Sequence, residues 1–234
     1  MSEFFELAGA IRRLSIFAIP LFFGITCHEV GHGLAAWRLG DLTAKHAGRL
    51  TINPLKHFDL LGAITFVLTL FLNGFVIGWA KPVPVMSIYF RDPRRGMILV
   101  SLAGPTANIF LALVFGLVFK LLLLGFEGNI TFLAERVLLP LIFICGAGIQ
   151  VNIVLALFNL IPIPPLDGGQ ILSGLLPSSI AIRFQSLERY GFLIVLLLLA
   201  SGLSGIIFLP IFQIFLAAIV GLYDLPRFFF DLAR

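Results

Sequence analysis

Five long apolar segments constrain the fold of this chain more than any other feature of its sequence. A helix of about 20 apolar residues is long enough to cross the roughly 30 Å of hydrocarbon in a bilayer. Because 59% of the residues are hydrophobic and only 12% are charged, we predict an all-α polytopic membrane protein. The last segment is interrupted, so we expect either two short spans, forming a C-terminal helical hairpin, or one broken span. The segments cover residues 14–38, 60–80, 97–124, 137–161 and 190–223.

The polar stretches between these segments are short and carry no sign of a second domain. They cover residues 39–59, 81–96 and 162–189. Each is too short for an independently folded module, so we expect residues 1–234 to form a single transmembrane domain. Loose alternation from His46 to Asn53 predicts a small β-hairpin at the membrane surface.

Charge and cysteine content exclude two other classes of protein. The net charge of +4 would suggest nucleic-acid binding in a soluble chain, but membrane proteins concentrate basic residues in cytoplasmic loops. We therefore expect the lipid bilayer, and no nucleic acid, as a partner. Cys27 and Cys145 lie in or beside apolar runs and are too few for a disulfide framework. We expect both to be small buried side chains rather than metal ligands.

A charged pattern, His28-Glu29-Val30-Gly31-His32, ends the first apolar segment. Charged groups at the edge of a membrane span cost free energy and therefore indicate a function. On a helix, residues i and i+4 lie on one face, one turn apart, so both imidazole rings can bind a single metal ion. Glu29 projects in another direction and is free to act on a water held by that ion. The pattern predicts a metal site.

A catalytic zinc site usually has three protein ligands and an open position for water, so a third ligand is required. Asp167 is the strongest candidate, because it follows the fourth apolar segment in the run Asn159-Leu-Ile-Pro-Ile-Pro-Pro-Leu-Asp167-Gly-Gly. Its prolines end the helix and its glycines permit close backbone approach. Irregular backbone at membrane depth must be buried by protein or line a wet cavity. The alternative is an ordinary Asp-Gly-Gly turn outside the bilayer. Weaker candidates are His46, His57, Asp41 and Asp59.

Three further residues are candidates for supporting roles. Asn159 is placed either to donate a hydrogen bond to an oxyanion or to cap helix carbonyls freed by the prolines. Gly104 and Asn108 occur in the sequence Gly-Pro-Thr-Ala-Asn within the third apolar segment. Close helix packing explains Gly104, whereas Asn108 is a candidate for orienting a ligand or binding the substrate backbone.

The two halves of the predicted metal site constrain the membrane topology. If every apolar segment crossed the bilayer, the histidine pair and Asp167 would emerge on opposite faces, where one ion could not bind both. We therefore predict that segment 60–80, which Asn73-Gly74 and Gly78 interrupt, is re-entrant and returns to the face it left.

The distribution of basic residues favours the same topology. With the N-terminus outside and two spans after residue 189, twelve of the 16 Lys and Arg residues face inward, against ten if six segments crossed. An inward bias is typical of cytoplasmic loops, so we predict a site nearer the cytoplasmic face, in the cell membrane. The inward residues are Arg38, Lys45, Arg49, Lys56, Lys81, Arg91, Arg94, Arg95, Arg183, Arg189, Arg227 and Arg234.

These elements together resemble the site-2 protease family of intramembrane zinc metalloproteases, also called peptidase family M50. The matching motifs are His28 to His32, Gly104-x-x-x-Asn108 and Asn159 to Gly168, within a core of about residues 14–169. Residues 78–85, Gly-Trp-Ala-Lys-Pro-Val-Pro-Val, are similar to the compact subgroup without PDZ or CBS domains. The resemblance implies one Zn²⁺ per chain held by His28, His32 and Asp167, with Glu29 activating water and Asn159 supporting the tetrahedral intermediate.

The resemblance also implies a reaction, the hydrolysis of peptide bonds within or near a transmembrane segment of another protein. Such substrates are often trimmed first by another protease, in regulated intramembrane proteolysis. Two alternatives remain open. A metal-binding or transport protein would carry more ionisable groups along a path through the membrane. An inactive family member acting as a scaffold would have no need of Glu29 between the histidines.

Overall fold

The computed structural model describes residues 2–71, 80–126 and 134–221, and in these ranges it contains helices and irregular connections but no β-strand. The predicted all-α fold is therefore confirmed. In chain order the elements are α1 (Ser2–Arg38), α2 (Thr43–His46), η1 (Pro54–Lys56), α3 (Leu60–Phe71), η2 (Ser87–Tyr89), α4 (Pro93–Phe126), η3 (Ala134–Leu138), α5 (Leu139–Asn159), α6 (Asp167–Leu175), α7 (Ser178–Gln185), α8 (Glu188–Ala200) and α9 (Leu203–Val220).

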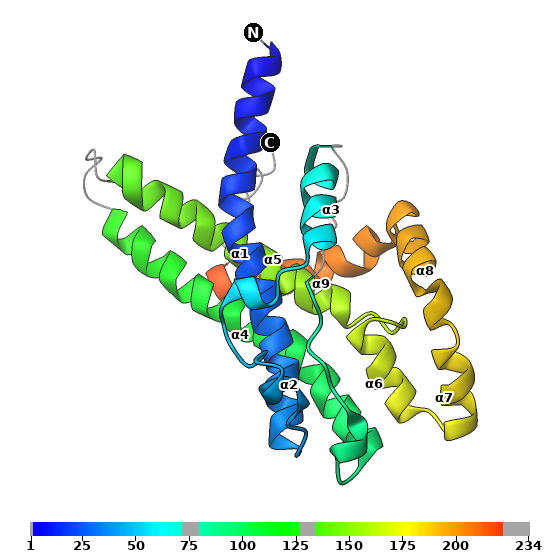
Figure 1. Ribbon diagram of the computed structural model, residues 1–234. Coiled ribbons are helices and arrows are strands. Elements are labelled where there is room, and N and C mark those ends of the chain that lie inside the picture. The colour runs from blue at the N-terminus through cyan, green and yellow to red at the C-terminus, as the bar shows by residue number, and fades with distance from the viewer. Residues whose placement is uncertain (1, 72–79, 127–133, 222–234) are drawn as a thin grey trace.

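Three helices, α1, α4 and α5, pack against one another and form the centre of the protein (Figure 1). Each contains a stretch long and apolar enough to cross a membrane: Leu14–Arg38, Pro93–Leu124 and Arg136–Asn159. These stretches correspond to the first, third and fourth apolar segments of the sequence. Their buried core includes Phe119, Ile149 and Ile153, and α9 packs on it through Ile219.

Small residues allow these helices to approach closely. A methyl group built on Gly31 of α1 would lie 2.7 Å from the carbonyl oxygen of Ala103 in α4, and one on Gly24 would lie 3.0 Å from the side-chain oxygen of Asn152 in α5. Glycine permits this approach because it has no side chain, as at other helix crossings in membranes. The metal-binding pattern on α1 is thereby pressed against α4.

Pairing between α1 and α4 shows that the end of α1 and the start of α4 lie together, as the predicted topology requires. His28 contacts Asn108, and His32 contacts Val100, so the two helices run antiparallel. The end of α1 and the start of α4 therefore lie at the same end of the protein, and the connecting residues 39–92 begin and end there.

The described residues at the two ends of segment 60–80 are compatible with the predicted re-entrant segment. Its described part, α3, has 12 residues and is about 18 Å long, too short to cross the hydrocarbon. Directly after the segment, the backbone N–H of Lys81 donates to the carbonyl of His57, 2.9 Å away, so the chain comes back to where it left. The predicted turn through Asn73-Gly74 and Gly78 lies outside the described residues.

The predicted hairpin at residues 46–53 was wrong. His46 ends the short helix α2, and the following residues form turns, with Gly48 at a φ of +64°. The buried carboxylate of Asp41 explains this, because its Oδ1 accepts from the N–H and hydroxyl of Thr43 and its Oδ2 accepts from the N–H of Met86. Burial would raise the pKa of Asp41, but these hydrogen bonds bring the pKa below its ordinary value. Hydrogen bonds from the backbone to the Asp41 side chain thus outweigh a loose alternation of polarity.

The C-terminal helices α8 and α9 meet at a break centred on Gly202, which has a left-handed φ of +73°. The two axes are bent by 80°, which is far from the antiparallel arrangement of a helical hairpin. The break coincides with the interruption in the last apolar segment. How many times this pair crosses the membrane stays a prediction.

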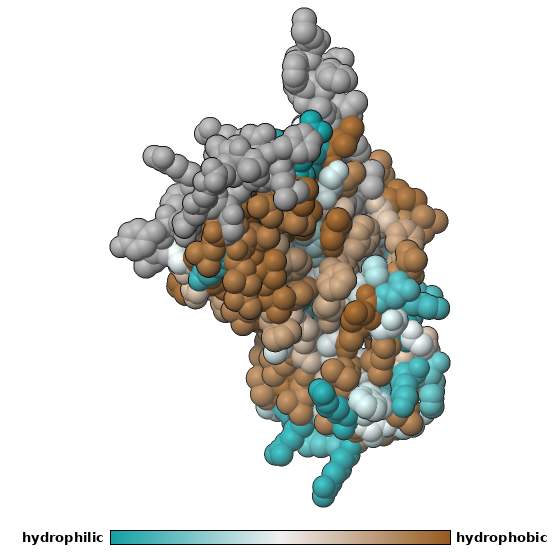
Figure 2. Space-filling view, turned by 90° about the vertical axis from the view of Figure 1, so that its left-hand side faces the viewer, coloured by the Kyte–Doolittle hydropathy of each residue, from teal (hydrophilic) through white to brown (hydrophobic). Residues whose placement is uncertain are grey.

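The surface divides into apolar and polar zones. In Figure 2, apolar side chains cover most of the middle of the molecule, and polar side chains gather at the lower end, the end where α2 and the start of α4 lie in Figure 1. Near this end, the Lys45 ammonium lies 5.4 Å from the ring centroid of Trp37. An aromatic residue beside a basic one is typical of a membrane interface.

Labelling of single cysteines tests the topology. In a chain whose Cys27 and Cys145 are replaced by alanine, cysteines introduced at Arg49 and at Lys81 should be modified by a membrane-impermeant reagent from the same face. A cysteine at Arg136, which begins the candidate span Arg136–Asn159, should be modified from the opposite face. Labelling of positions 49 and 81 from opposite faces would contradict the re-entrant segment.

Candidate metal centre

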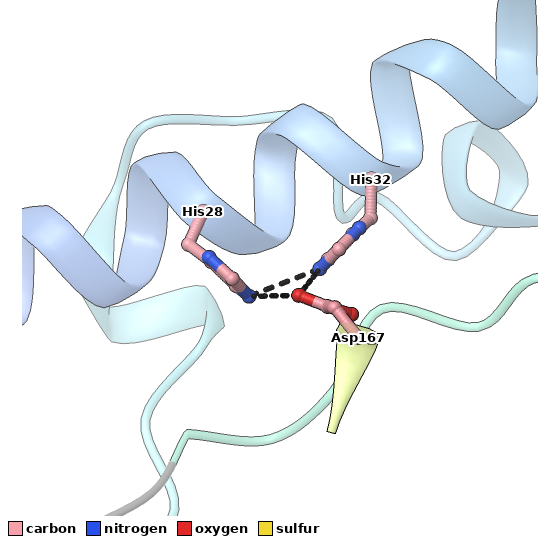
Figure 3. A group of neighbouring side chains, drawn as sticks. All are labelled: His28, His32 and Asp167. Carbon is pink, nitrogen blue, oxygen red and sulfur yellow. Dashed lines mark hydrogen bonds and ion pairs between the residues drawn. The ribbon is translucent and has the colours of Figure 1, made fainter. Parts of the chain in front are cut away.

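Two histidines on α1 and one aspartate on α6 converge on a single point (Figure 3). His28 and His32 are one helical turn apart, and their Nε2 atoms are 3.0 Å from each other. The Oδ2 atom of Asp167 lies 3.2 Å from Nε2 of His28 and 3.3 Å from Nε2 of His32. The structure therefore brings together the three residues predicted as metal ligands, although 135 positions separate His32 from Asp167.

The turn between α5 and α6 delivers Asp167 to the histidines. Residues 160–166 fold back through backbone hydrogen bonds from Ile163 to Ile161 and from Leu166 to Ile163, and α6 begins at Asp167. A methyl group on Gly168 would overlap the carbonyl oxygens of Leu160 and Ile161. The absence of a side chain at Gly168 thus lets the start of α6 lie directly on the proline-rich turn.

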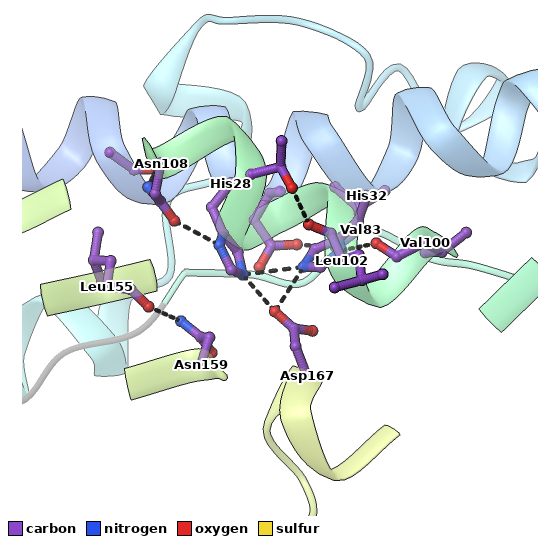
Figure 4. Close-up of polar contacts among 12 residues, drawn as sticks. His28, His32, Val83, Val100, Leu102, Asn108, Leu155, Asn159 and Asp167 are labelled. Carbon is purple, nitrogen blue, oxygen red and sulfur yellow. Dashed lines mark hydrogen bonds and ion pairs between the residues drawn. The ribbon is translucent and has the colours of Figure 1, made fainter. Parts of the chain in front are cut away.

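Hydrogen bonds at the other ring nitrogens determine the tautomer of both histidines (Figure 4). Nδ1 of His28 lies 2.7 Å from Oδ1 of Asn108, and Nδ1 of His32 lies 2.7 Å from the carbonyl oxygen of Val100. Because both partners are acceptors, each Nδ1 must carry the proton and donate it. In the neutral ring, each Nε2 then presents a lone pair toward Asp167, the arrangement required of metal-binding histidines. A second proton on Nε2 would instead make the ring a donor to Asp167.

The resulting group fits a cation and is unfavourable without one. Oδ2 of Asp167 is buried and accepts no hydrogen bond of acceptable geometry, so two imidazole lone pairs and a carboxylate oxygen face one another. A tetrahedral zinc site with ligand bonds of about 2.0–2.1 Å has ligand atoms about 3.3 Å apart, close to the separations of 3.0–3.3 Å found here. Two imidazole nitrogens and one carboxylate oxygen are also a common catalytic zinc set.

Glu29 lies beside this group with its carboxylate held by a different part of the chain. Its Oε2 accepts a hydrogen bond of 2.7 Å from the backbone N–H of Val83, in the irregular stretch that follows segment 60–80. Pro82 and Pro84 have no N–H, so Val83 is the only donor among these three residues. The glutamate is therefore oriented from outside its own helix.

One face of α4 covers the metal centre. Val100, Gly104 and Asn108 follow one another at intervals of four residues, so they lie on one face of the helix. A methyl group on Gly104 would overlap the ring of His32 and would lie 2.7 Å from Cε1 of His28. Gly104, predicted as a helix-packing residue, thus packs against the metal centre itself, and Asn108 orients His28 as one of its predicted roles requires.

Asn159 is the last residue of α5, and its amide donates to the carbonyl of Leu155, 2.9 Å away (Figure 4). Leu155 precedes the carbonyls that the prolines free, so this bond is neither of the two arrangements predicted for Asn159, and both stay predictions. Donation to an oxyanion would require rotation of the side chain away from Leu155.

The weaker candidates for metal ligation have other contacts. Nε2 of His57 lies 3.0 Å from the carbonyl of Thr51, and the carboxylate of Asp59 accepts from the N–H of Gly62 at the start of α3. His46 is exposed at the end of α2, and the carboxylate of Asp41 accepts hydrogen bonds from Thr43 and Met86. None of them belongs to the described group that could hold a metal ion.

Asn152 is a polar residue that the sequence reasoning missed. It lies in the middle of α5, is fully buried, and its Oδ1 accepts a 2.9 Å hydrogen bond from the amide of Asn108. The sequence could have indicated Asn152 as a candidate, because it is an amide inside a long apolar run, two helical turns before Asn159.

Fold and site together define a class of protein: a helical membrane protein with a His-Glu-x-x-His metal centre completed by a distant aspartate. The family model described as Peptidase family M50 matches residues 16–201, most of the chain. The chain therefore belongs to peptidase family M50, the site-2 protease family, and is a metallopeptidase and an integral membrane protein. The predicted resemblance is confirmed.

Similar curated proteins carry names of the same kind. The chain is 40% identical over 192 residues to "Putative zinc metalloprotease YwhC" of Bacillus subtilis, covering 82% of this chain and 83% of that protein. It is 35% identical over 201 residues to "Putative zinc metalloprotease Rip2" of Mycolicibacterium smegmatis, covering 83% of this chain and 72% of that protein. No solved structure matches the chain.

Replacement of Gly104 by alanine should disrupt the metal centre. The added methyl group has no space beside His32 and His28, so the rings must move and the bound metal, measured per chain by mass spectrometry, should fall by at least tenfold. Gly205→Ala is the matched control, because a methyl group there meets nothing within 4 Å. Full metal content in Gly104→Ala would show that the rings tolerate displacement.

Proposed function

We propose that this protein is an intramembrane zinc metalloprotease that hydrolyses peptide bonds within or near the transmembrane segments of membrane proteins. The observation that carries the proposal is the buried carboxylate oxygen of Asp167 opposite two imidazole lone pairs, beside Glu29. This arrangement stands on helices apolar enough to cross a membrane, so substrate segments in the bilayer lie at the same depth.

The first element of the mechanism is the metal site. His28, His32 and Asp167 would hold one Zn²⁺, since their donor atoms and separations suit it. Zinc at this position supplies a Lewis acid that lowers the pKa of water and polarises a carbonyl. Asn108 and Val100 keep the two rings in the tautomer that leaves Nε2 free to bind.

Glu29 is the general base. Its Oε2 is held by the N–H of Val83, which leaves Oε1 to take the proton from the attacking water. Glu29 then returns a proton to the leaving amine as the peptide bond breaks. Asn159, after rotating away from Leu155, would donate to the oxyanion.

The substrate must unwind before it reacts. A helix uses its carbonyls in internal hydrogen bonds, so the scissile carbonyl is exposed only when the local helix opens. The irregular residues 80–86 pass beside Glu29 and are best placed to hold the opened strand by backbone pairing.

The proposal also includes the face of the membrane toward which the metal centre opens and the state in which the substrate arrives. The bias of basic residues favours a site that opens toward the cytoplasmic face of the cell membrane. Substrates trimmed beforehand by another protease would enter more easily, because a bulky extramembrane domain would no longer hinder their approach.

Substitution of Glu29 by glutamine tests the central assignment. The variant should keep about one zinc per chain, because Glu29 is not in the ligand group, while cleavage of a reconstituted transmembrane substrate falls by about 10²–10⁴-fold. Undiminished cleavage would remove Glu29 from the mechanism. A wild-type protein that binds zinc but cleaves no membrane substrate would favour the transport or scaffold alternative.

Helix stability in the substrate should govern the cleavage rate. An Ala→Gly change next to a mapped cleavage site lowers helix stability by about 1 kcal/mol, and should accelerate cleavage up to about fivefold. The same change two turns away from the cleavage site serves as the control. Equal rates for the two substrates would contradict the requirement for local unwinding.

A further inference from the structure

We propose that Asn152 is a positioning residue for the metal centre, which acts on His28 through Asn108 and keeps His28 in its metal-binding tautomer. The inference rests on the proposed zinc site and adds to it a residue from a third helix. The inference is based on the hydrogen bonds among three buried side chains: Asn152 on α5, Asn108 on α4 and His28 on α1.

A continuous series of hydrogen bonds joins the three helices. Asn152 donates through Nδ2 to the carbonyl of Gly148, 2.8 Å away in its own helix, and accepts through Oδ1 from Nδ2 of Asn108 at 2.9 Å. Asn108 also donates to the carbonyl of Gly24 at 2.9 Å, and its Oδ1 lies 2.7 Å from Nδ1 of His28. Asn152 and Asn108 are both fully buried.

The direction of these bonds follows from the groups at their ends. The carbonyl of Gly148 accepts only, so it must face the amide nitrogen of Asn152, which turns Oδ1 of Asn152 toward Asn108. Asn108 then faces two acceptors, Oδ1 of Asn152 and the carbonyl of Gly24, and must present Nδ2 to both. Its Oδ1 is left pointing at His28.

Reversal of the Asn108 amide would disable the metal centre. With Nδ2 facing His28, the ring would have to accept at Nδ1 and carry its proton on Nε2, the atom that faces Asp167. A protonated Nε2 has no lone pair for a metal ion. The reversal would also set Oδ1 of Asn108 against two other oxygens in a buried site, where unpaired polar groups are costly.

Asn152 is needed because the Gly24 carbonyl holds only one of the two amide hydrogens of Asn108. The packing accommodates this side chain closely, since a methyl group on Gly24 would lie 3.0 Å from Oδ1 of Asn152. Ordinary helix packing at this position would be served by an apolar residue, without burying an amide.

The test is zinc affinity, measured by competition with a chelator on the full-length protein in detergent. Asn152→Leu should weaken zinc binding about tenfold, the lower end of the effect of residues that support metal ligands. It should also alter the visible spectrum of the Co²⁺-loaded protein, because the position of the His28 ring changes. Gln150→Leu, two residues away on α5 and outside this hydrogen-bond series, is the control and should leave both readouts unchanged.

A double substitution separates positioning from general structural damage. If Asn152 acts through Asn108, adding Asn152→Leu to Asn108→Leu should weaken zinc binding no further than Asn108→Leu alone. Losses that multiply would overturn the proposal, as would an Asn152→Leu protein with wild-type affinity and spectrum. Failure of the wild-type protein to bind zinc would instead overturn the proposed function on which the inference rests.

If Asn152→Leu does not fold, the variant Asn152→Thr tests whether residue 152 positions Asn108. Threonine hydroxyls in this protein donate to the carbonyl four residues earlier, as Thr26 does to Phe22 and Thr106 to Leu102, both at 2.7 Å. A threonine at 152 would make the same bond to Gly148 and present a lone pair toward Asn108. Its zinc affinity should be within about threefold of wild type, since the support is weakened but retained. A loss of tenfold or more in this variant would overturn the proposal.

Discussion

Two imidazole lone pairs and one buried carboxylate oxygen meet within 3.0–3.3 Å of one another, and much of the structure is arranged to hold them there. With both rings neutral and no cation, this contact is repulsive, because none of the three atoms then has a proton to share. The tautomers of His28 and His32 therefore matter as much as their positions. Both are determined from α4, by the side chain of Asn108 and the carbonyl of Val100.

Close helix packing makes this contact possible. Gly31 and Gly104 bring α1 and α4 together, and Gly104 leaves just the space that the two rings occupy. Antiparallel pairing places the end of α1 beside the start of α4, so the segment between them must return to its own face. The metal centre and the predicted re-entrant topology thus both depend on one helix pairing, and Glu29 connects the two regions through its bond to Val83.

Sequence reasoning succeeded where the signal is local or strictly spaced. The i, i+4 histidines, the proline-rich run before Asp167 and the apolar segments each impose a structure through short-range chemistry. It failed at residues 46–53, where the loose alternation was overridden by hydrogen bonds from Thr43 and from Met86, 45 residues away in sequence, to the carboxylate of Asp41. It also missed Asn152, because the role of a buried amide in an apolar helix depends on its partners on other helices.

The sequence by itself determined that the chain is a helical membrane protein, which residues are able to bind a metal, and that one apolar segment should not cross. These conclusions follow from periodicity, segment length and ligand chemistry, which any short stretch of chain carries. Only the tertiary structure decided the tautomers of the histidines, the orientation of Glu29 and the hydrogen-bond series from Asn152 to His28. Each of these depends on which acceptor faces which donor across a helix interface, and such directions exist only after the helices have packed.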